Sequence, residues 1–128
     1  MNNERYERGM EKLREVDGEL GDQVVAALED ISPDLGRLLL EYPFGDIYSR
    51  PQLSLKDREL VTISALAAMG SCAPQLKVHI NGALNVGWTR EEVIETFIQM
   101  TVYAGFPSAL NAIFLAKETF AELDGKAV

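Results

Sequence analysis

Signals for the start and the end of helices recur at short intervals along this chain, and they constrain its fold more than any other feature of the sequence. Within residues 3–17, apolar side chains follow the helical period of three- and four-residue steps, at Tyr6, Met10, Leu13 and Val16. Gly18 and Gly21 then break this pattern, and we expect a short second helix around residues 23–29. Ser32-Pro33 is typical of a helix start, and this third helix is expected to run through Tyr42 and to stop at Pro43.

The second half of the chain carries the same kind of signals. Thr89 and Glu92 have the spacing of a capping box at the start of a helix. The expected helices run from just after Ser54 to Gly70, from Pro74 to about Val86, from Thr89 to near Gly105, and from Pro107 or Ser108 to about Leu123. No segment sustains the two-residue alternation of a strand, so we expect an all-α fold of about six helices. The length of 128 residues predicts one domain, at residues 1–128.

Charge and composition exclude several classes of function. The net charge is −8, which repels the phosphates of nucleic acids. No apolar run is long enough to span a membrane, and residues 1–17 are charged rather than signal-like, so we expect a cytoplasmic protein without nucleic-acid or membrane partners. The sequence has no glycine-rich phosphate loop and no His and Cys cluster with zinc spacing. We therefore expect no cofactor and no metal.

One expected helix indicates self-association. Its side chains are apolar around most of the circumference, at Val93, Ile94, Phe97, Ile98, Met100, Thr101 and Val102. Such a helix lies either at the centre of a subunit or in a contact shared with a neighbour. Because the chain is small, we expect a homo-oligomer.

The chain has one histidine, His79, and one cysteine, Cys72, which rules out a disulfide within the chain. Histidine changes its charge near neutral pH, so His79 is the natural proton carrier. Glu59 lies on the preceding helix, and a tight turn at residues 70–73 would let Glu59 and His79 meet across an antiparallel pair. A carboxylate there would orient the imidazole and stabilise its protonated form. Cys72 precedes a helix N-terminus, a position that favours the thiolate.

Each candidate also has a plain structural interpretation, and the residues alone leave both open. A lone histidine on a helix is usually a surface or structural residue, and a lone cysteine is usually a small buried apolar one. Glu59 could be a solvated helix position. Tyr42, Phe44 and Tyr48 are more typical of a core or an interface than of ligand binding. Arg50 lies in an irregular connection, where functional residues concentrate.

Four stretches of the chain form an ordered set: Gly45-Asp-Ile-Tyr-Ser-Arg-Pro51, Asp57-Arg-Glu-Leu60, His79-Ile-Asn-Gly-Ala-Leu84 with Gly87, and Val102-Tyr-Ala-Gly-Phe-Pro-Ser-Ala109. Together they resemble the carboxymuconolactone decarboxylase family, within the wider superfamily of AhpD-like alkylhydroperoxidases. The resemblance runs from Arg5 to Ala116. It implies an AhpD-like helical bundle that assembles into a ring-like homo-oligomer, commonly a hexamer, with sites at or near the subunit contacts.

The redox branch of this superfamily has a Cys-x-x-Cys pair, a histidine after three intervening residues and a glutamate on the preceding helix. The resemblance places these on Cys72, His79 and approximately Glu59. Gln75 stands where the second cysteine would be, so this chain has no resolving thiol for a dithiol cycle. Peroxide reduction of that kind is disfavoured, although an external thiol could still resolve an oxidised Cys72.

The decarboxylase branch needs no cofactor, metal or cysteine pair. The resemblance implies loss of CO₂ from 4-carboxymuconolactone, in protocatechuate degradation, to give an enol-lactone. We assign His79 as the acid–base group and Glu59 as its orienting partner. Arg50 is the candidate clamp for the substrate carboxylate, and Tyr48 and Tyr103 are candidate hydrogen-bond donors to the lactone.

Three functions follow from these observations. The first is a cofactor-free decarboxylase of 4-carboxymuconolactone, or of a related small carboxylated lactone or keto acid, with His79 as proton carrier. The alternative is a thiol-dependent alkylhydroperoxidase with peroxiredoxin-like activity through Cys72. The third is a non-catalytic helical oligomer that binds a small molecule or a protein.

Overall fold

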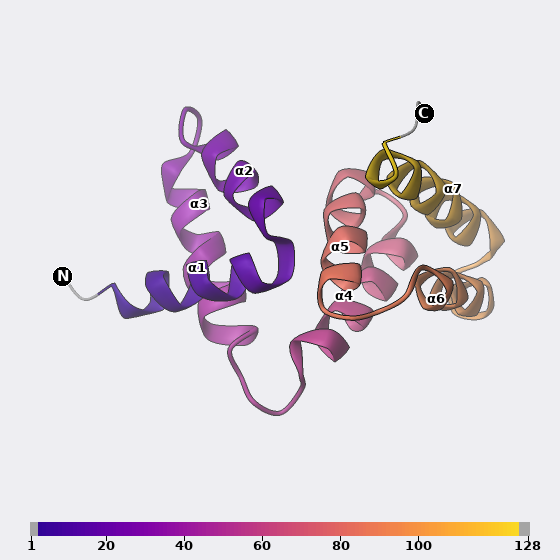
Figure 1. Cartoon of the computed structure of the whole chain (residues 1–128), viewed down its shortest axis with the longest axis horizontal. Coiled ribbons are helices and arrows are strands. Elements are labelled where there is room, and N and C mark those ends of the chain that lie inside the picture. Colours follow the sequence, from indigo (N-terminus) through magenta and orange to yellow (C-terminus); the bar gives the residue numbers. More distant parts are fainter. Residues whose placement is uncertain (1–2, 126–128) are drawn as a thin grey trace. The chain divides into compact units, whose positions relative to one another are not determined.

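The computed structural model describes residues 3–125, which form two compact helical units, residues 3–55 and residues 56–125 (Figure 1). The first unit contains α1 (Glu4–Asp17), α2 (Glu19–Leu28), α3 (Pro33–Leu39) and a π-helical segment, η1 (Leu40–Ile47). The second contains α4 (Leu55–Met69, which starts at the boundary), α5 (Ala73–Asn85), α6 (Arg90–Tyr103) and α7 (Phe106–Leu123). The described residues include no strand, so the predicted all-α fold is confirmed, with seven α-helices rather than about six. The domain assignment 1–128 stays a prediction.

The second helix begins earlier than the sequence predicted. Gly18 breaks the chain as expected, with a φ of 56°, but Gly21 lies inside α2. Gly21 is buried, and a Cβ there would lie 2.6 Å from Cγ of Leu13. Its lack of a side chain therefore serves close packing of α2 on α1 rather than a break.

Pro43 does not stop the third helix, and that expectation was wrong. The chain continues from α3 into η1 through Pro43, and the N–H of Tyr48 donates to the carbonyl of Pro43 at 2.7 Å. A proline lacks the N–H for an α-helical bond, and its ring crowds the carbonyl four residues earlier. The wider π-helical turn gives the ring room there, so the helix widens instead of ending.

Backbone contact between α1 and η1 holds the first unit together. A Cβ at Gly9 would overlap the carbonyl oxygen of Leu40, and a Cβ at Gly45 would lie 2.6 Å from the carbonyl oxygen of Arg5. Nε and Nη2 of Arg5 also donate to the carboxylate of Asp46, at 3.1 and 2.7 Å. This guanidinium holds the pKa of Asp46 below its usual value. Side chains larger than hydrogen would force α1 and η1 apart.

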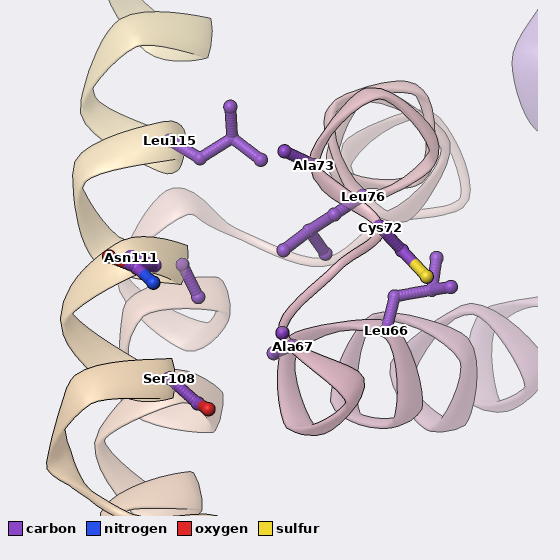
Figure 2. Close-up of a pocket in the computed structure, with 10 residues that line it drawn as sticks. Leu66, Ala67, Cys72, Ala73, Leu76, Ser108, Asn111 and Leu115 are labelled. Atoms are coloured by element: carbon purple, nitrogen blue, oxygen red, sulfur yellow. The ribbon is translucent and has the colours of Figure 1, made fainter.

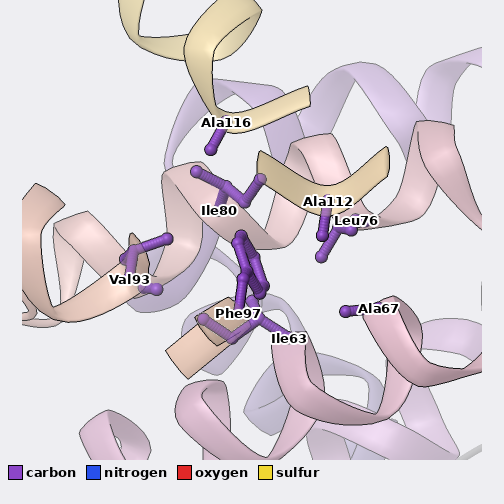
Figure 3. Packing of buried hydrophobic residues seen from close by; sticks show 9 residues of the cluster. Ile63, Ala67, Leu76, Ile80, Val93, Phe97, Ala112 and Ala116 are labelled. Carbon is purple, nitrogen blue, oxygen red and sulfur yellow. The ribbon is translucent and has the colours of Figure 1, made fainter. Parts of the chain in front are cut away.

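The core of the second unit is built around Phe97 of α6 (Figure 3). Ile63 of α4, Ile80 of α5 and Val93 of α6 are fully buried with it. Small side chains bring α7 close to this core, at Ala109, Ala112 and Ala116. Together these contacts fix α4 and α5, the two helices that carry the candidate site.

Two helices begin with the capping residues that the sequence predicted. The Thr89 hydroxyl accepts from the N–H of Glu92 at 3.1 Å, and Glu92 Oε1 accepts from the N–H of Thr89 at 2.9 Å. The Ser32 hydroxyl accepts from the N–H of Leu35 at 3.3 Å.

Across residues 3–125, no helix is both long enough and apolar enough to cross a membrane.

Candidate active site

Glu59 and His79 meet between α4 and α5. The Nδ1 atom of His79 lies 2.8 Å from Oε1 of Glu59. The Glu59 side chain is 0% exposed, whereas the His79 side chain is 19% exposed. The interpretation of Glu59 as a solvated helix position is therefore wrong, and the structure brings the predicted pair together.

The turn between α4 and α5 makes this meeting possible. Gly70 has a φ of 78°, a left-handed conformation that L side chains rarely adopt and that lets the chain reverse. Cys72 is the N-cap residue of α5, and Pro74 occupies the first turn, where its missing N–H is not needed. Glu59 and His79 stand on opposite sides of this turn, so the reversal of direction sets them facing each other.

The geometry assigns different tasks to the two nitrogens of the imidazole. Because Nδ1 is bonded to Glu59, exchange of a proton with a substrate would run through Nε2. A carboxylate on Nδ1 fixes the tautomer and the ring orientation and stabilises the imidazolium that forms during proton transfer.

Ion pairs hold α5 and α6 against α7. Lys77, two residues before His79, reaches Glu122 at 2.6 Å and Glu118 at 3.8 Å. The hydrogen bond to Glu122 raises the pKa of Lys77. Arg90 binds both carboxylate oxygens of Asp124, at 3.0 and 2.7 Å. The ion pairs of Lys77 restrain α5, the helix on which His79 lies.

Cys72 lines a small cavity between α4, α5 and α7 (Figure 2). Its side chain is half-buried, and its Sγ lies 3.9 Å from the hydroxyl of Ser71. The cavity has a volume of about 30 Å³. Pockets for drug-sized ligands have about 300–1,000 Å³, so this cavity is too small for a carboxylated lactone.

The remaining predicted site residues are spread over both units. Tyr48 packs its ring 4.9 Å from the ring of Phe44, which is buried as a core residue. Arg50 is exposed in the turn after η1, where its N–H donates to the carbonyl of Ile47 at 3.1 Å. Tyr103 is the last residue of α6, and 79% of it is exposed. The roles of Tyr48, Arg50 and Tyr103 stay predictions.

Sequence reasoning missed two features of the described residues. Asp17, at the end of α1, is a buried carboxylate, and its place directly after Val16 of the apolar stripe was the available signal. Ser108 and Asn111 line the cavity beside Cys72 (Figure 2). They lie among small residues of α7, which the sequence indicated only as a surface for close packing.

Comparison with known proteins places the site within a family. The model of the carboxymuconolactone decarboxylase family matches residues 33–118, a range that includes Glu59, Cys72 and His79. The chain belongs to the carboxymuconolactone decarboxylase family. The resemblance inferred from the four sequence stretches is thereby confirmed.

Three known proteins are similar to this chain over most of its length. It is 34% identical to the 4-carboxymuconolactone decarboxylase of Acinetobacter baylyi over 125 residues, 96% of this chain and 92% of that protein. It is 27% identical to the nitrosuccinic acid decarboxylase of Metarhizium robertsii over 124 residues, 94% of this chain and 85% of that protein. An uncharacterized 15.0 kDa protein of Paracoccus denitrificans is 34% identical over 117 residues, 91% of this chain and 87% of that protein. Two of these relatives are decarboxylases, and they support decarboxylation as the class of reaction.

Proposed function

We propose that this protein is a decarboxylase of a small carboxylated lactone, with 4-carboxymuconolactone as the first substrate to test. The observation that carries the proposal is the bond between Nδ1 of His79 and the buried carboxylate of Glu59, in a chain of this family. A related lactone or a keto acid belongs to the same substrate class.

The proposed reaction breaks one carbon–carbon bond. The substrate carboxylate leaves as CO₂, and the electron pair of the broken bond spreads into the unsaturated lactone. His79 then donates the Nε2 proton to a ring carbon, and water restores that proton after product release. The electron sink lies in the substrate itself, so the proposal requires no cofactor. Glu59 acts as a positioning residue, because it holds the imidazole and stabilises its charged form.

Three further residues have proposed tasks at the substrate. Arg50 would bind the carboxylate through two parallel hydrogen bonds, as guanidinium groups do. Tyr48 and Tyr103 would donate hydrogen bonds to the lactone carbonyl, where negative charge develops. Substitution of Arg50 should therefore raise KM more than it lowers kcat.

The names of the two decarboxylase relatives support a common chemical class. One is named for a carboxylated lactone and the other for a nitro acid. A conjugated lactone and a nitro group both accept the electron pair that a departing CO₂ leaves behind. We infer that the substrate of this protein carries its carboxylate where such an electron-accepting group can receive that pair.

The assembly and location belong to the proposal as well. We propose a homo-oligomer, with a hexamer as the first state to test, that acts on a small-molecule substrate in the cytoplasm. Analytical ultracentrifugation measures the number of subunits, and cell fractionation measures the location of the protein.

The test of the function is the loss of substrate absorbance and the release of CO₂, measured with purified protein and 4-carboxymuconolactone. We expect turnover above the uncatalysed rate, and a decrease in kcat of on the order of 10²–10⁴ in His79→Gln, because a positioned acid contributes about that much. A matched control is Asn81→Ala, at a half-buried position on α5 near His79. A wild-type rate equal to the solution rate for the lactone, related keto acids and nitro acids would contradict the proposal.

A further inference from the structure

Gln75 lies one helical turn before His79 on α5, and its side chain takes no part in the core. Residues four apart on a helix are neighbours, with Cβ atoms about 5–6 Å apart. Gln75 is exposed, and across residues 3–125 its side-chain amide forms no hydrogen bond to another residue. A glutamine amide carries two N–H donors. Gln75 therefore holds two available donors beside the imidazole of His79.

The other neighbours of His79 on α5 have no polar side chain to offer a substrate. They are the remaining residues at three and four positions from His79, namely Leu76, Gly82 and Ala83, and all three are buried. Leu76 is also a member of the hydrophobic core around Phe97. Within one turn of His79, the polar side chain that α5 presents is therefore that of Gln75.

On α4, the two polar side chains at three positions from Glu59 are Lys56 and Thr62, and both have other partners. The Thr62 hydroxyl donates its single proton to the carbonyl of Arg58 at 2.8 Å. The Lys56 ammonium lies 4.5 Å from the centroid of the Trp88 ring. The indole N–H of Trp88 also donates to the Lys56 carbonyl at 2.6 Å, which fixes Lys56 beside the turn between α5 and α6. The available donors next to the Glu59–His79 pair in this unit are thus those of Gln75.

The proposed reaction needs a donor where negative charge develops. When the bond to the substrate carboxylate breaks, its electron pair passes into the lactone, and the carbonyl oxygen of the lactone gains negative charge. A hydrogen bond to that oxygen is stronger in the transition state than in the bound substrate, so it raises kcat. The donor must lie close to the acid, because both contact the same small ring.

We propose that the side-chain amide of Gln75 donates a hydrogen bond to the lactone carbonyl oxygen while His79 delivers its proton to the ring carbon. The spacing of about 5–6 Å between the two Cβ atoms lets one five-membered ring contact both side chains. Gln75 neither gains nor loses a proton, so the balance of the reaction is unchanged. This inference rests on the proposed decarboxylase function, and it adds a requirement for the substrate: the group that accepts the electron pair must end in an oxygen, as a carbonyl or a nitro group does.

The test compares kcat and KM of wild type, Gln75→Leu and Gln75→Glu with 4-carboxymuconolactone at neutral pH. Gln75→Leu removes the donors, and we expect kcat to fall by on the order of 10–100-fold with KM within a few-fold of wild type, since an enclosed donor of this kind contributes about 10²–10³. Gln75→Glu keeps the shape but adds a negative charge, so its kcat should fall further. Gln23→Glu, the same change at an exposed position of α2, is the control and should keep the wild-type kcat.

The pH dependence of Gln75→Glu gives a second readout, which a merely structural role would not move. The introduced carboxyl becomes protonated as the pH falls toward about 4.3, the ordinary value for glutamate, and its O–H then donates in place of the amide. The ratio of the wild-type kcat to the Gln75→Glu kcat should therefore decrease with falling pH. The same ratio for Gln75→Leu should stay constant, because leucine has nothing to titrate.

Circular dichroism and the melting temperature show whether each variant is folded. A folded Gln75→Leu with the wild-type kcat overturns the inference and leaves the decarboxylase function standing. A rise in KM alone also overturns it, because the contact would then be as strong in the bound substrate as in the transition state. If Gln75→Leu unfolds, Gln75→Glu decides, and a ratio that does not change with pH overturns the inference. A wild type without turnover of the lactone, related keto acids or nitro acids overturns the proposed function, and this inference with it.

Discussion

Nδ1 of His79 lies 2.8 Å from Oε1 of Glu59, a carboxylate that is 0% exposed. The pair joins a water-excluded anion to a ring that is partly accessible. Removing the charge of Glu59 while keeping its shape should therefore weaken the reaction without changing how the substrate binds.

Glu59→Gln tests that relationship. We expect kcat to fall by at least on the order of 10–100-fold, the loss seen when a histidine at a metal site loses the partner that orients it, with KM within a few-fold of wild type. The measurement is the steady-state rate of lactone decarboxylation. Asp57→Asn, the same change at an exposed position of α4, is the control and should retain the wild-type rate. A purely structural role for Glu59 would instead change the melting temperature and leave kcat per folded molecule intact.

Cys72→Ser separates the two proposed chemistries. The decarboxylation described above uses no thiol, and serine has nearly the shape of cysteine beside the cavity of about 30 Å³. The decarboxylation rate should therefore stay within about two-fold of wild type. Loss of activity as severe as in His79→Gln, together with thiol-dependent consumption of a hydroperoxide by wild type, would favour the peroxidase alternative.

Gly9→Ala should destabilise the first unit. The new Cβ would overlap the carbonyl oxygen of Leu40, and backbone atoms cannot move aside as a flexible side chain can. We expect a loss of about 2–4 kcal/mol in the free energy of unfolding, measured with urea. Gly36→Ala is the matched control on α3, because the nearest atom to its new Cβ is Cβ of Leu28 at 3.8 Å. It should be neutral or stabilising by up to about 1 kcal/mol, since alanine is the better helix former.

The capping box of α6 should make stability depend on pH. The hydrogen bond from the N–H of Thr89 holds the pKa of Glu92 below its usual value of 4.5. A group with a depressed pKa stabilises the folded state above its unfolded value, and this contribution is lost as the pH falls through the folded value. Glu92→Gln should therefore be less stable than wild type at neutral pH, and the difference should vanish at acidic pH. Thermal unfolding of both proteins, measured at pH values from neutral to below the folded pKa of Glu92, gives this difference in stability. A difference that does not change with pH would contradict the stabilising role of the Glu92 carboxylate.

Sequence patterns predicted the local features of this fold better than its packing. The capping box at Thr89 and the N-cap at Ser32 involve only residues that are close in sequence, so the spacing of these residues was enough to predict them. The contact between Glu59 and His79 could also be predicted, because a short turn between two helices leaves few ways for the helices to pack. Pro43 and Gly21 were misinterpreted because their effects depend on what packs around them. Burial of Glu59 is a property of the folded chain, and no local pattern encodes it.

The bond between His79 and Glu59 has a spectroscopic consequence. His79 is the single histidine of the chain, so a proton NMR spectrum of the folded protein contains signals from one imidazole and needs no assignment among several. A proton on Nδ1 that is held by a carboxylate shielded from water exchanges slowly and resonates far downfield. The chain thus carries an intrinsic probe at its candidate site, which reports each change of protonation, substrate or assembly without any added label.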